Sequence, residues 1–213
     1  MAAVDSWKHT KRIYITYGRF QPCTWGHENS FNKIKSDADK DGCDYRIFLS
    51  HTNDKNENPL DQITKLELMK KLVPTHADKL VAINPSSPQM CVAYCMKKHR
   101  ANEKIKGIAS IPEAYDECVY MVGSDRVAAM QYLHNYNGCN PKRKNPEQAP
   151  DFSMLYFEVR STGARDADGK TFSISGTKMR NWGRASDKKN FKAGLPKSHT
   201  LTETEITAFM ALL

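Results

Sequence analysis

The sequence predicts an α/β fold, in which a Rossmann-like parallel sheet is flanked by helices and followed by a short helical tail. Short apolar runs rich in β-branched and aromatic residues alternate along the chain with segments whose apolar residues recur at helical spacing. Strands separated by helices form parallel sheets with right-handed crossovers. The 213 residues, 39% of them hydrophobic, are enough for one domain with a small appendage.

Five strands and five helices are expected from these patterns. The expected strands are residues 12–17, 45–50, 79–84, 118–123 and 154–160. The expected helices are residues 27–35, 60–72, 89–99, 125–136 and 202–213. Asp61 is a candidate N-cap of the second helix, and Thr202 with Glu205 has the spacing of a capping box. We expect the Rossmann-like domain over residues 11–185 and the helical extension over residues 186–213.

The composition favours an anionic small molecule as the partner. The net charge is +8 and the isoelectric point is about 9.1, which suits a nucleotide, a phosphorylated metabolite or a nucleic acid. The basic residues are not gathered in one arm or tail, so a nucleic acid is not the favoured partner, and surface lysines that only aid solubility are the alternative. The sequence does not indicate an oligomeric state.

Cysteine usage and hydropathy bear on the compartment. The six cysteines form no CxxC pair, which favours reduced thiols over disulfides or a zinc site. No apolar run is long enough to span a membrane, and the first residues lack the apolar core of a secretory signal. We therefore expect no membrane partner and a cytoplasmic location.

The stretch GRFQPCTWGH, residues 18–27, follows the first expected strand. Gly18 and Gly26 allow backbone to approach a ligand closely. Thr24 and His27 are three residues apart, so a helix starting near them puts both on one side. The dipole and free N–H groups of a helix start attract phosphate, and His27 can donate a hydrogen bond to a phosphoryl oxygen as charge develops there. The alternative is a capped helix start with a surface histidine.

The stretch SISGTKMR, residues 173–180, repeats this chemistry after the last expected strand. Ser175 and Thr177 would lie at a second donor-rich helix start, and Lys178 and Arg180 add positive charge that can clamp a phosphate. Ligands of such sheets bind at the carboxyl ends of the strands. The two helix starts together could therefore hold a triphosphate.

These stretches resemble the (H/T)xGH and ISxTxxR motifs of the nucleotidylyltransferase superfamily. The GRFQP lead-in is similar to the archaeal-type nicotinamide mononucleotide adenylyltransferases. The stretches SHTNDKNENPLDQITKL, VGSDRV and SISGTKMRNWGRASDKKNFKAGLP resemble more closely a group of small phage and viral nucleotidyltransferases. The resemblance covers residues 11–196, nearly the whole chain. It implies a fold of the nucleotidylyltransferase type.

The implied reaction transfers a nucleoside monophosphate group from ATP or CTP to a phosphate-bearing acceptor. Pyrophosphate is released, no covalent enzyme intermediate forms, and Mg²⁺ accompanies the nucleotide. The resemblance implies three catalytic residues, His27, Thr24 and Arg180, with Thr24 in place of a histidine that could carry positive charge. It implies these nucleotide-binding residues: Gly18, Arg19, Phe20, Gly26, Gly123, Asp125, Ser175, Thr177 and Lys178. No protein ligand of a metal is implied.

Several alternatives stay open from the sequence. A nicotinamide mononucleotide adenylyltransferase is the first, and a non-catalytic nucleotide- or RNA-binding module is an alternative of another class. A class I aminoacyl-tRNA synthetase fragment is opposed by the absence of a KMSKS-type stretch. ARDADGKT, residues 164–171, nearly matches a phosphate-binding loop, but a turn is favoured, in which Arg165 could face the acceptor. Residues 51–59 form either an acceptor-binding loop or an ordinary connection, and Asp125 is equally suited to be an N-cap.

Overall fold

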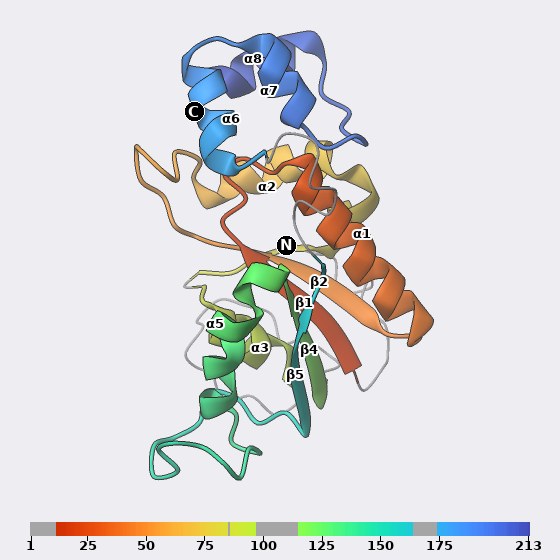
Figure 1. Cartoon of the computed structure of the whole chain (residues 1–213), viewed down its shortest axis with the longest axis vertical. Helices are drawn as coiled ribbons and strands as arrows, with labels where there is room; N and C mark the ends of the chain where they lie inside the picture. The colour runs from red at the N-terminus through yellow and green to blue at the C-terminus, as the bar shows by residue number, and fades with distance from the viewer. Residues whose placement is uncertain (1–11, 85, 97–114, 164–173) are drawn as a thin grey trace.

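A five-stranded parallel sheet forms the centre of the molecule, with strand order β3-β2-β1-β4-β5. The computed structural model describes residues 12–84, 86–96, 115–163 and 174–213. Every pair of neighbouring strands is parallel, as Figure 1 shows. The strands are β1 (Arg12–Gly18), β2 (Asp44–Leu49), β3 (Leu80–Ala82), β4 (Glu117–Val122) and β5 (Tyr156–Ser161). The predicted α/β class and parallel sheet are confirmed.

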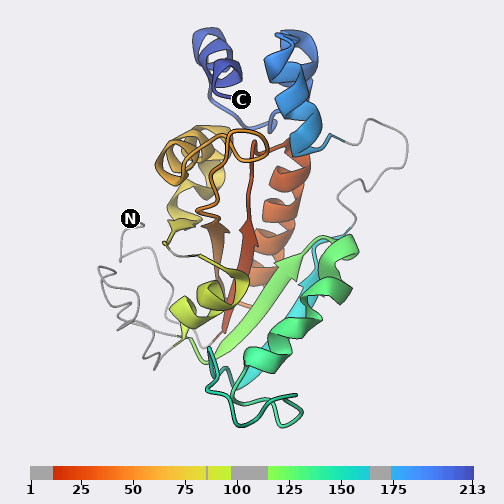
Figure 2. The ribbon, with the colours of Figure 1, turned by 90° about the vertical axis from the view of Figure 1, so that its left-hand side faces the viewer.

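Helices cover both faces of this sheet (Figure 2). One apolar core lies beneath α1 (Trp25–Lys40), α2 (Gln62–Leu72) and the 3-10 segment η2 (Pro74–Lys79). A second core lies beneath α3 (Pro88–Cys95), α5 (Val127–Met130) and the 3-10 segment η4 (Gln131–Tyr136). Tyr14 of β1 belongs to the first core, and its neighbours Ile13 and Ile15 belong to the second. This alternation buries both faces of β1, as expected of a parallel sheet.

The strand order places a crevice between β1 and β4. From β1 the chain winds outward to β2 and β3, and it then returns to β4 on the other side of β1 and continues to β5. Where the winding reverses, the connections after two neighbouring strands leave in opposite directions, and ligands bind in the space between them. The ends of β1 and β4 are therefore the expected place for a site.

Three C-terminal helices pack against one another beyond the carboxyl ends of the strands (Figure 1). They are α6 (Gly176–Arg184), α7 (Lys188–Gly194) and α8 (Glu203–Ala211). The buried carboxylate of Glu28 on α1 accepts the backbone N–H groups of Lys197 and Ser198, at 2.6 and 3.1 Å, which fixes this helical unit to the sheet domain. The helix α6, which precedes residue 186, packs with α7 and α8, and the division of the chain at residues 185 and 186 stays a prediction.

Other elements differ from the sequence pattern in length or regularity. The expected helix 125–136 is divided into the 3-10 segment η3 (Ser124–Arg126), the short α5 and η4. The Asn137 side chain fixes the end of this segment, because it donates to the carbonyl and accepts from the N–H of Met154, both at 3.0 Å. The helix begun at residue 25 continues to Lys40, and α7 had no counterpart among the expected helices. The capping box of Thr202 and Glu205 is formed.

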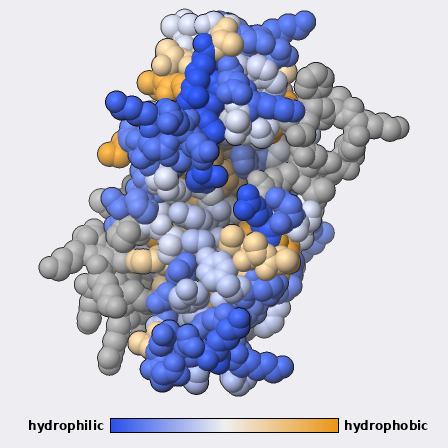
Figure 3. Space-filling model, turned by 60° about the vertical axis from the view of Figure 1, so that its left-hand side comes forward, coloured by the Kyte–Doolittle hydropathy of each residue, from blue (hydrophilic) through white to orange (hydrophobic). Residues whose placement is uncertain are grey.

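None of the six cysteines forms a disulfide, and five of them are buried. Across the described ranges, no helix has the length and apolar character needed to cross a membrane. The face in Figure 3 is mostly hydrophilic, with only small, separate hydrophobic patches between the grey atoms.

Candidate functional site

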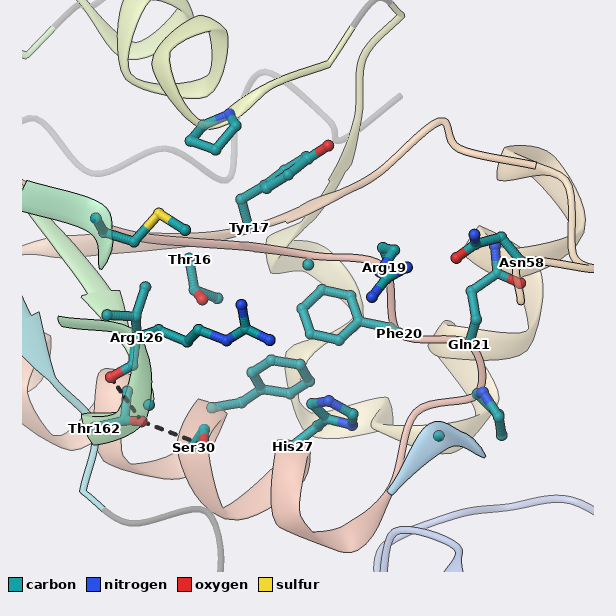
Figure 4. A pocket seen from close by; sticks show the side chains of 18 of the residues that line it. Thr16, Tyr17, Arg19, Phe20, Gln21, His27, Ser30, Asn58, Arg126 and Thr162 are labelled. Carbon is teal, nitrogen blue, oxygen red and sulfur yellow. Dashed lines mark hydrogen bonds between the residues drawn. The ribbon is translucent and has the colours of Figure 1, made fainter. Parts of the chain in front are cut away.

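A cavity of about 450 Å³ lies at the carboxyl ends of β1 and β4, which is within the usual range for small-molecule sites. Its wall combines the end of β1, the loop into α1, the first turns of α1, residues 57 and 58, the end of β4 and the start of α6. Figure 4 shows these side chains converging from both faces of the sheet. The site thus occupies the crevice that the strand order creates.

The His27 ring is held by the helix start on which it lies. Thr24 is the N-cap of α1, and its backbone N–H donates to Nδ1 of His27 at 3.0 Å. A nitrogen that accepts a hydrogen bond from an N–H is unprotonated, so Nε2 carries the proton in the neutral ring. His27 lines the cavity, and this tautomer makes its Nε2 a hydrogen-bond donor.

Thr24 lies beneath His27 and not in the cavity wall. The side chain of Thr24 is 2% exposed, and its hydroxyl is 3.0 Å from Nδ1 of His27. The sequence placed both residues on one side of the helix facing phosphate. In the structure only His27 is in the wall. The side chain of Thr24, at the N-cap position, is turned toward the first turn of α1, where it meets the His27 ring.

Phe20 fills the space beside Gly18. Phe20 has a φ of 46°, and its ring is so close that a Cβ on Gly18 would lie 2.5 Å from it. The ring also makes edge contacts with His27 and Phe31, each with a centroid distance of 5.2 Å. The glycine is therefore required by the ring of Phe20, whereas the sequence suggested that it admits the ligand.

The two sequence motifs meet at Arg180. Its Nη1 donates to the carbonyl oxygen of Gln21 at 2.6 Å, and its Nη2 donates to the hydroxyl of Thr177 at 3.1 Å. A Cβ on Gly176 would lie 2.9 Å from the same carbonyl oxygen, so glycine lets the start of α6 approach the first motif. Burial and the nearby charge of Arg184 lower the pKa of Arg180, but an arginine remains charged in proteins. Residues of both motifs, among them His27, Thr177 and Arg180, are thus in one wall.

Ser175 caps the start of α6 and does not line the cavity. Its hydroxyl accepts the backbone N–H of Lys178 at 3.2 Å, which is the ordinary role of a serine at this position. Lys178 is exposed and is also outside the cavity wall.

Residues 51–60 are held against the first motif by Gln21. Its amide nitrogen donates to the carbonyl oxygens of Thr52 and Leu60 at 3.1 and 2.9 Å, and its amide oxygen accepts the Leu60 N–H at 2.8 Å. This loop brings Glu57 and Asn58 into the cavity wall. Glu57 pairs with Arg19 at 3.3 Å. The loop is therefore part of the site.

The β4 side of the cavity contributes Gly123 and Arg126. Asp125 lies outside the wall, with its carboxylate 3.5 Å from Nε of Arg126. The stretch VGSDRV contains Arg126, for which the sequence indicated no role. The position of Arg126 was nevertheless a usable signal, because a cation that directly follows a buried strand lies at the ligand edge of the sheet.

The cavity wall contains seven of the residues predicted from the sequence: Gly18, Arg19, Phe20, His27, Gly123, Thr177 and Arg180. Five predicted residues lie outside it: Thr24, Gly26, Asp125, Ser175 and Lys178. Arg165 and the segment ARDADGKT are outside the described residues. Sequence reasoning missed several polar wall residues: Thr16, Tyr17, Gln21, Ser30, Glu57, Asn58, Arg126 and Thr162.

The described wall carries more positive than negative charge. It contains Arg19, Arg126 and Arg180 but a single carboxylate, that of Glu57, which favours an anionic ligand. Within the described ranges, no group of three or more His, Cys, Asp or Glu side chains could hold a metal ion.

Comparisons with known proteins give similarities to solved structures only. No family model matches the chain, and no curated protein matches it. Among the solved structures that match is one from Vibrio parahaemolyticus described as "a Putative Nicotinate-nucleotide Adenylyltransferase". It is 14% identical, with a TM-score of 0.42, over 95% of this chain and 99% of that chain. At this level the similarity carries no inference about the activity of the present chain.

Proposed function

We propose that the protein is a nucleotidyltransferase of the nucleotidylyltransferase superfamily. It would transfer a nucleoside monophosphate group from ATP or CTP to a phosphate-bearing small molecule and release pyrophosphate. The observation that carries the proposal is the junction of the two motifs at the strand crevice. Arg180 of the second motif donates to the Gln21 carbonyl of the first, and His27 and Thr177 lie in the same wall.

The wall residues suit in-line transfer without a covalent intermediate. Arg180 and Thr177, at the start of α6, would bind the outer phosphates of the triphosphate. His27 would donate from Nε2 to an oxygen of the attacked phosphate as negative charge develops there. Thr24 would act indirectly, by holding the His27 ring. Catalysis of this kind depends on positioning and on charge stabilisation.

Mg²⁺ would enter with the nucleotide. It would supply charge neutralisation on the phosphate oxygens. Glu57 is the one carboxylate in the described wall, and it is paired with Arg19. The donor set therefore fits a metal held mostly by phosphate oxygens and water, with hydroxyls such as that of Thr16 nearby.

The acceptor's phosphate has a candidate partner in Arg126. This residue lies on the β4 side, away from the motif junction, in the same cavity (Figure 4). Arg126 and Arg180 would then hold two different anionic groups, one for each substrate. The mostly buried cysteines, none of which forms a disulfide, support a cytoplasmic enzyme, acting in the host cytoplasm if the chain is viral.

The direct test is pyrophosphate release in a panel of four nucleoside triphosphates and phosphorylated acceptors with Mg²⁺. His27→Ala should lower the rate about 10²- to 10³-fold, the loss expected for one donor to a developing oxyanion. Arg180→Ala should lose activity, whereas Lys178→Ala, on the same helix but outside the wall, is its matched control. No pyrophosphate from any pair would reject the proposal, and an unchanged His27→Ala rate would reject the role of His27.

The same panel separates the alternatives. Turnover confined to ATP with nicotinamide mononucleotide would identify the adenylyltransferase of NAD synthesis. Tight RNA binding with a steep salt dependence and no turnover would instead identify a nucleic-acid-binding module.

A further inference from the structure

Asn58 presents a buried hydrogen-bond acceptor that no described residue uses. Its side chain is in the cavity wall and only 3% exposed. Its Oδ1 is buried and accepts no hydrogen bond from any residue that the structure describes. Buried polar atoms almost always have a partner, and one without a partner requires an explanation.

The orientation of the Asn58 amide is fixed by Asp54. Nδ2 of Asn58 donates to Oδ2 of Asp54 at 2.5 Å. The other carboxylate oxygen of Asp54 accepts the backbone N–H groups of Asn56, Glu57 and Asn58. These bonds lower the pKa of Asp54 to about 2, so the carboxylate is ionised and can only accept. A flipped amide would set its oxygen against that carboxylate, and Oδ1 therefore stays on the opposite side.

Neighbouring side chains do not supply the missing donor. The Gln21 amide is used on both atoms by backbone groups of Thr52 and Leu60. Arg19, which the Asn58 amide faces in Figure 4, directs Nη1 to Glu57. That ion pair is exposed, so it contributes little stability and can open at small cost to admit a ligand.

The chemistry of the missing partner follows from what Oδ1 can accept. The ionised oxygens of a phosphate accept hydrogen bonds and cannot donate them, so they do not fit here. An N–H or O–H group does fit. Phosphate oxygens would instead be bound by donors in the same wall, such as His27, Thr177 and Arg180.

We infer that Asn58 is a specificity-determining residue whose Oδ1 accepts a hydrogen bond from an amino or hydroxyl group of a substrate bound in this cavity. The inference rests on the proposed function only for the identity of that substrate. The donor is either on the nucleotide, as a base amino group or a ribose hydroxyl, or on the acceptor. A donor-reading site discriminates strongly, because a substrate without the donor leaves the buried oxygen unpaired.

Three variants separate the ligand contact from the loop contact. Asn58→Leu removes Oδ1 and the bond to Asp54. Asp54→Ala removes the loop bonds but keeps Oδ1. The double substitution Asp54→Asn with Asn58→Asp reverses the bond between the two side chains, because the new amide can donate to the new carboxylate, and it keeps an acceptor on residue 58.

The substrate test measures the affinities of ATP, CTP, GTP, UTP and 2′-deoxy-ATP by calorimetry, and the KM of each substrate that the wild type turns over. Asn58→Leu should weaken at least one substrate about 10- to 100-fold, the usual cost of a lost partner for a buried polar group, while the double substitution should restore most of it. Weakening of a triphosphate assigns the donor to the nucleotide. A raised acceptor KM with unchanged triphosphate affinity assigns it to the acceptor. Wild-type values for every substrate in Asn58→Leu would overturn the inference.

A second measurement needs no substrate, so it still decides if the proposed activity fails. In the free protein Asn58→Leu should unfold thermally no earlier than Asp54→Ala, because it loses only one of the bonds that Asp54→Ala loses. A markedly lower unfolding temperature for Asn58→Leu would show that Oδ1 has a structural partner, and the inference would be wrong. Absence of pyrophosphate release together with an intact Asn58 effect on triphosphate affinity would reject the proposed function alone.

Discussion

The contact between Gly18 and Phe20 gives a prediction that depends on geometry alone. In Gly18→Ala the new methyl group would lie 2.5 and 2.6 Å from two atoms of the Phe20 ring, far inside normal van der Waals contact. The ring cannot move aside freely, because it is buried and packs edge-on against Phe31 and His27.

The expected cost is about 1–3 kcal/mol of the free energy of unfolding, which is typical of overpacking. Swinging the Phe20 ring out of the core would avoid the clash, but it would expose a side chain whose burial is worth about 1.5–3 kcal/mol. The two alternatives are similar in size, so the estimate holds whichever way the protein relaxes.

A double-mutant cycle measured by urea unfolding tests this reasoning. The four proteins are the wild type, Gly18→Ala, Phe20→Ala and the double variant. The three nearest atoms to the new methyl group all belong to the Phe20 ring, so without the ring the cost of the methyl group should fall, and the coupling energy should be about 1–3 kcal/mol. Because the ring also holds His27, Gly18→Ala should lower kcat as well. Equal costs of Gly18→Ala in both backgrounds, or a cost below about 0.5 kcal/mol in the wild type, would refute the reasoning.

Three further predictions concern a cation, a buried amine and the metal. In Arg180→Lys the amine cannot bond both the Gln21 carbonyl and the Thr177 hydroxyl, because it lacks the fork geometry of arginine. The free energy of unfolding should therefore fall by about 1–3 kcal/mol, and the KM for the triphosphate should rise. A wild-type KM would contradict this. Burial lowers the pKa of Lys65 from 10.5 to about 8, so between these pH values the unfolded chain binds more protons than the folded protein. The wild type should therefore gain stability relative to Lys65→Met as the pH rises through that window. A stability difference that does not change with pH would contradict the lowered pKa. EDTA should stop pyrophosphate release without lowering the unfolding temperature, since the described residues offer no cluster for a structural metal; a lowered temperature would reveal such a site.

The sheet and the position of the site could be predicted because their signals are local. The alternation of Ile13, Tyr14 and Ile15 shows a strand buried on both faces, and it needs no knowledge of what packs there. The order of strands and helices then places both motifs at the carboxyl edge. His27 and Arg180 were found in this way, and both lie in the cavity wall.

The missed features depend on contacts between distant segments. Thr24 and His27 have a spacing that places both on one side of a helix, but the spacing does not show which of them is buried. The conformation of Phe20 sets a requirement for glycine at residue 18 that the sequence does not show, and the approach of a ligand to Gly18 stays a prediction. The sequence left residues 51–59 open as an acceptor-binding loop, but the place of Asn58 in the wall depends on bonds from outside the loop, made by Gln21 and Arg184.

The attachment of α6 to the first motif also has a consequence for local opening. Motion of the helical unit away from the sheet would break the Arg180 bond to the Gln21 carbonyl and separate the two phosphate-binding segments. A bound triphosphate would bridge them, so it would stabilise the closed arrangement by about 2.7 kcal/mol at a concentration one hundred times its dissociation constant. The substrate would thereby slow hydrogen exchange in α6 more than in the outer strands, and release of the product would require the same opening that the substrate suppresses.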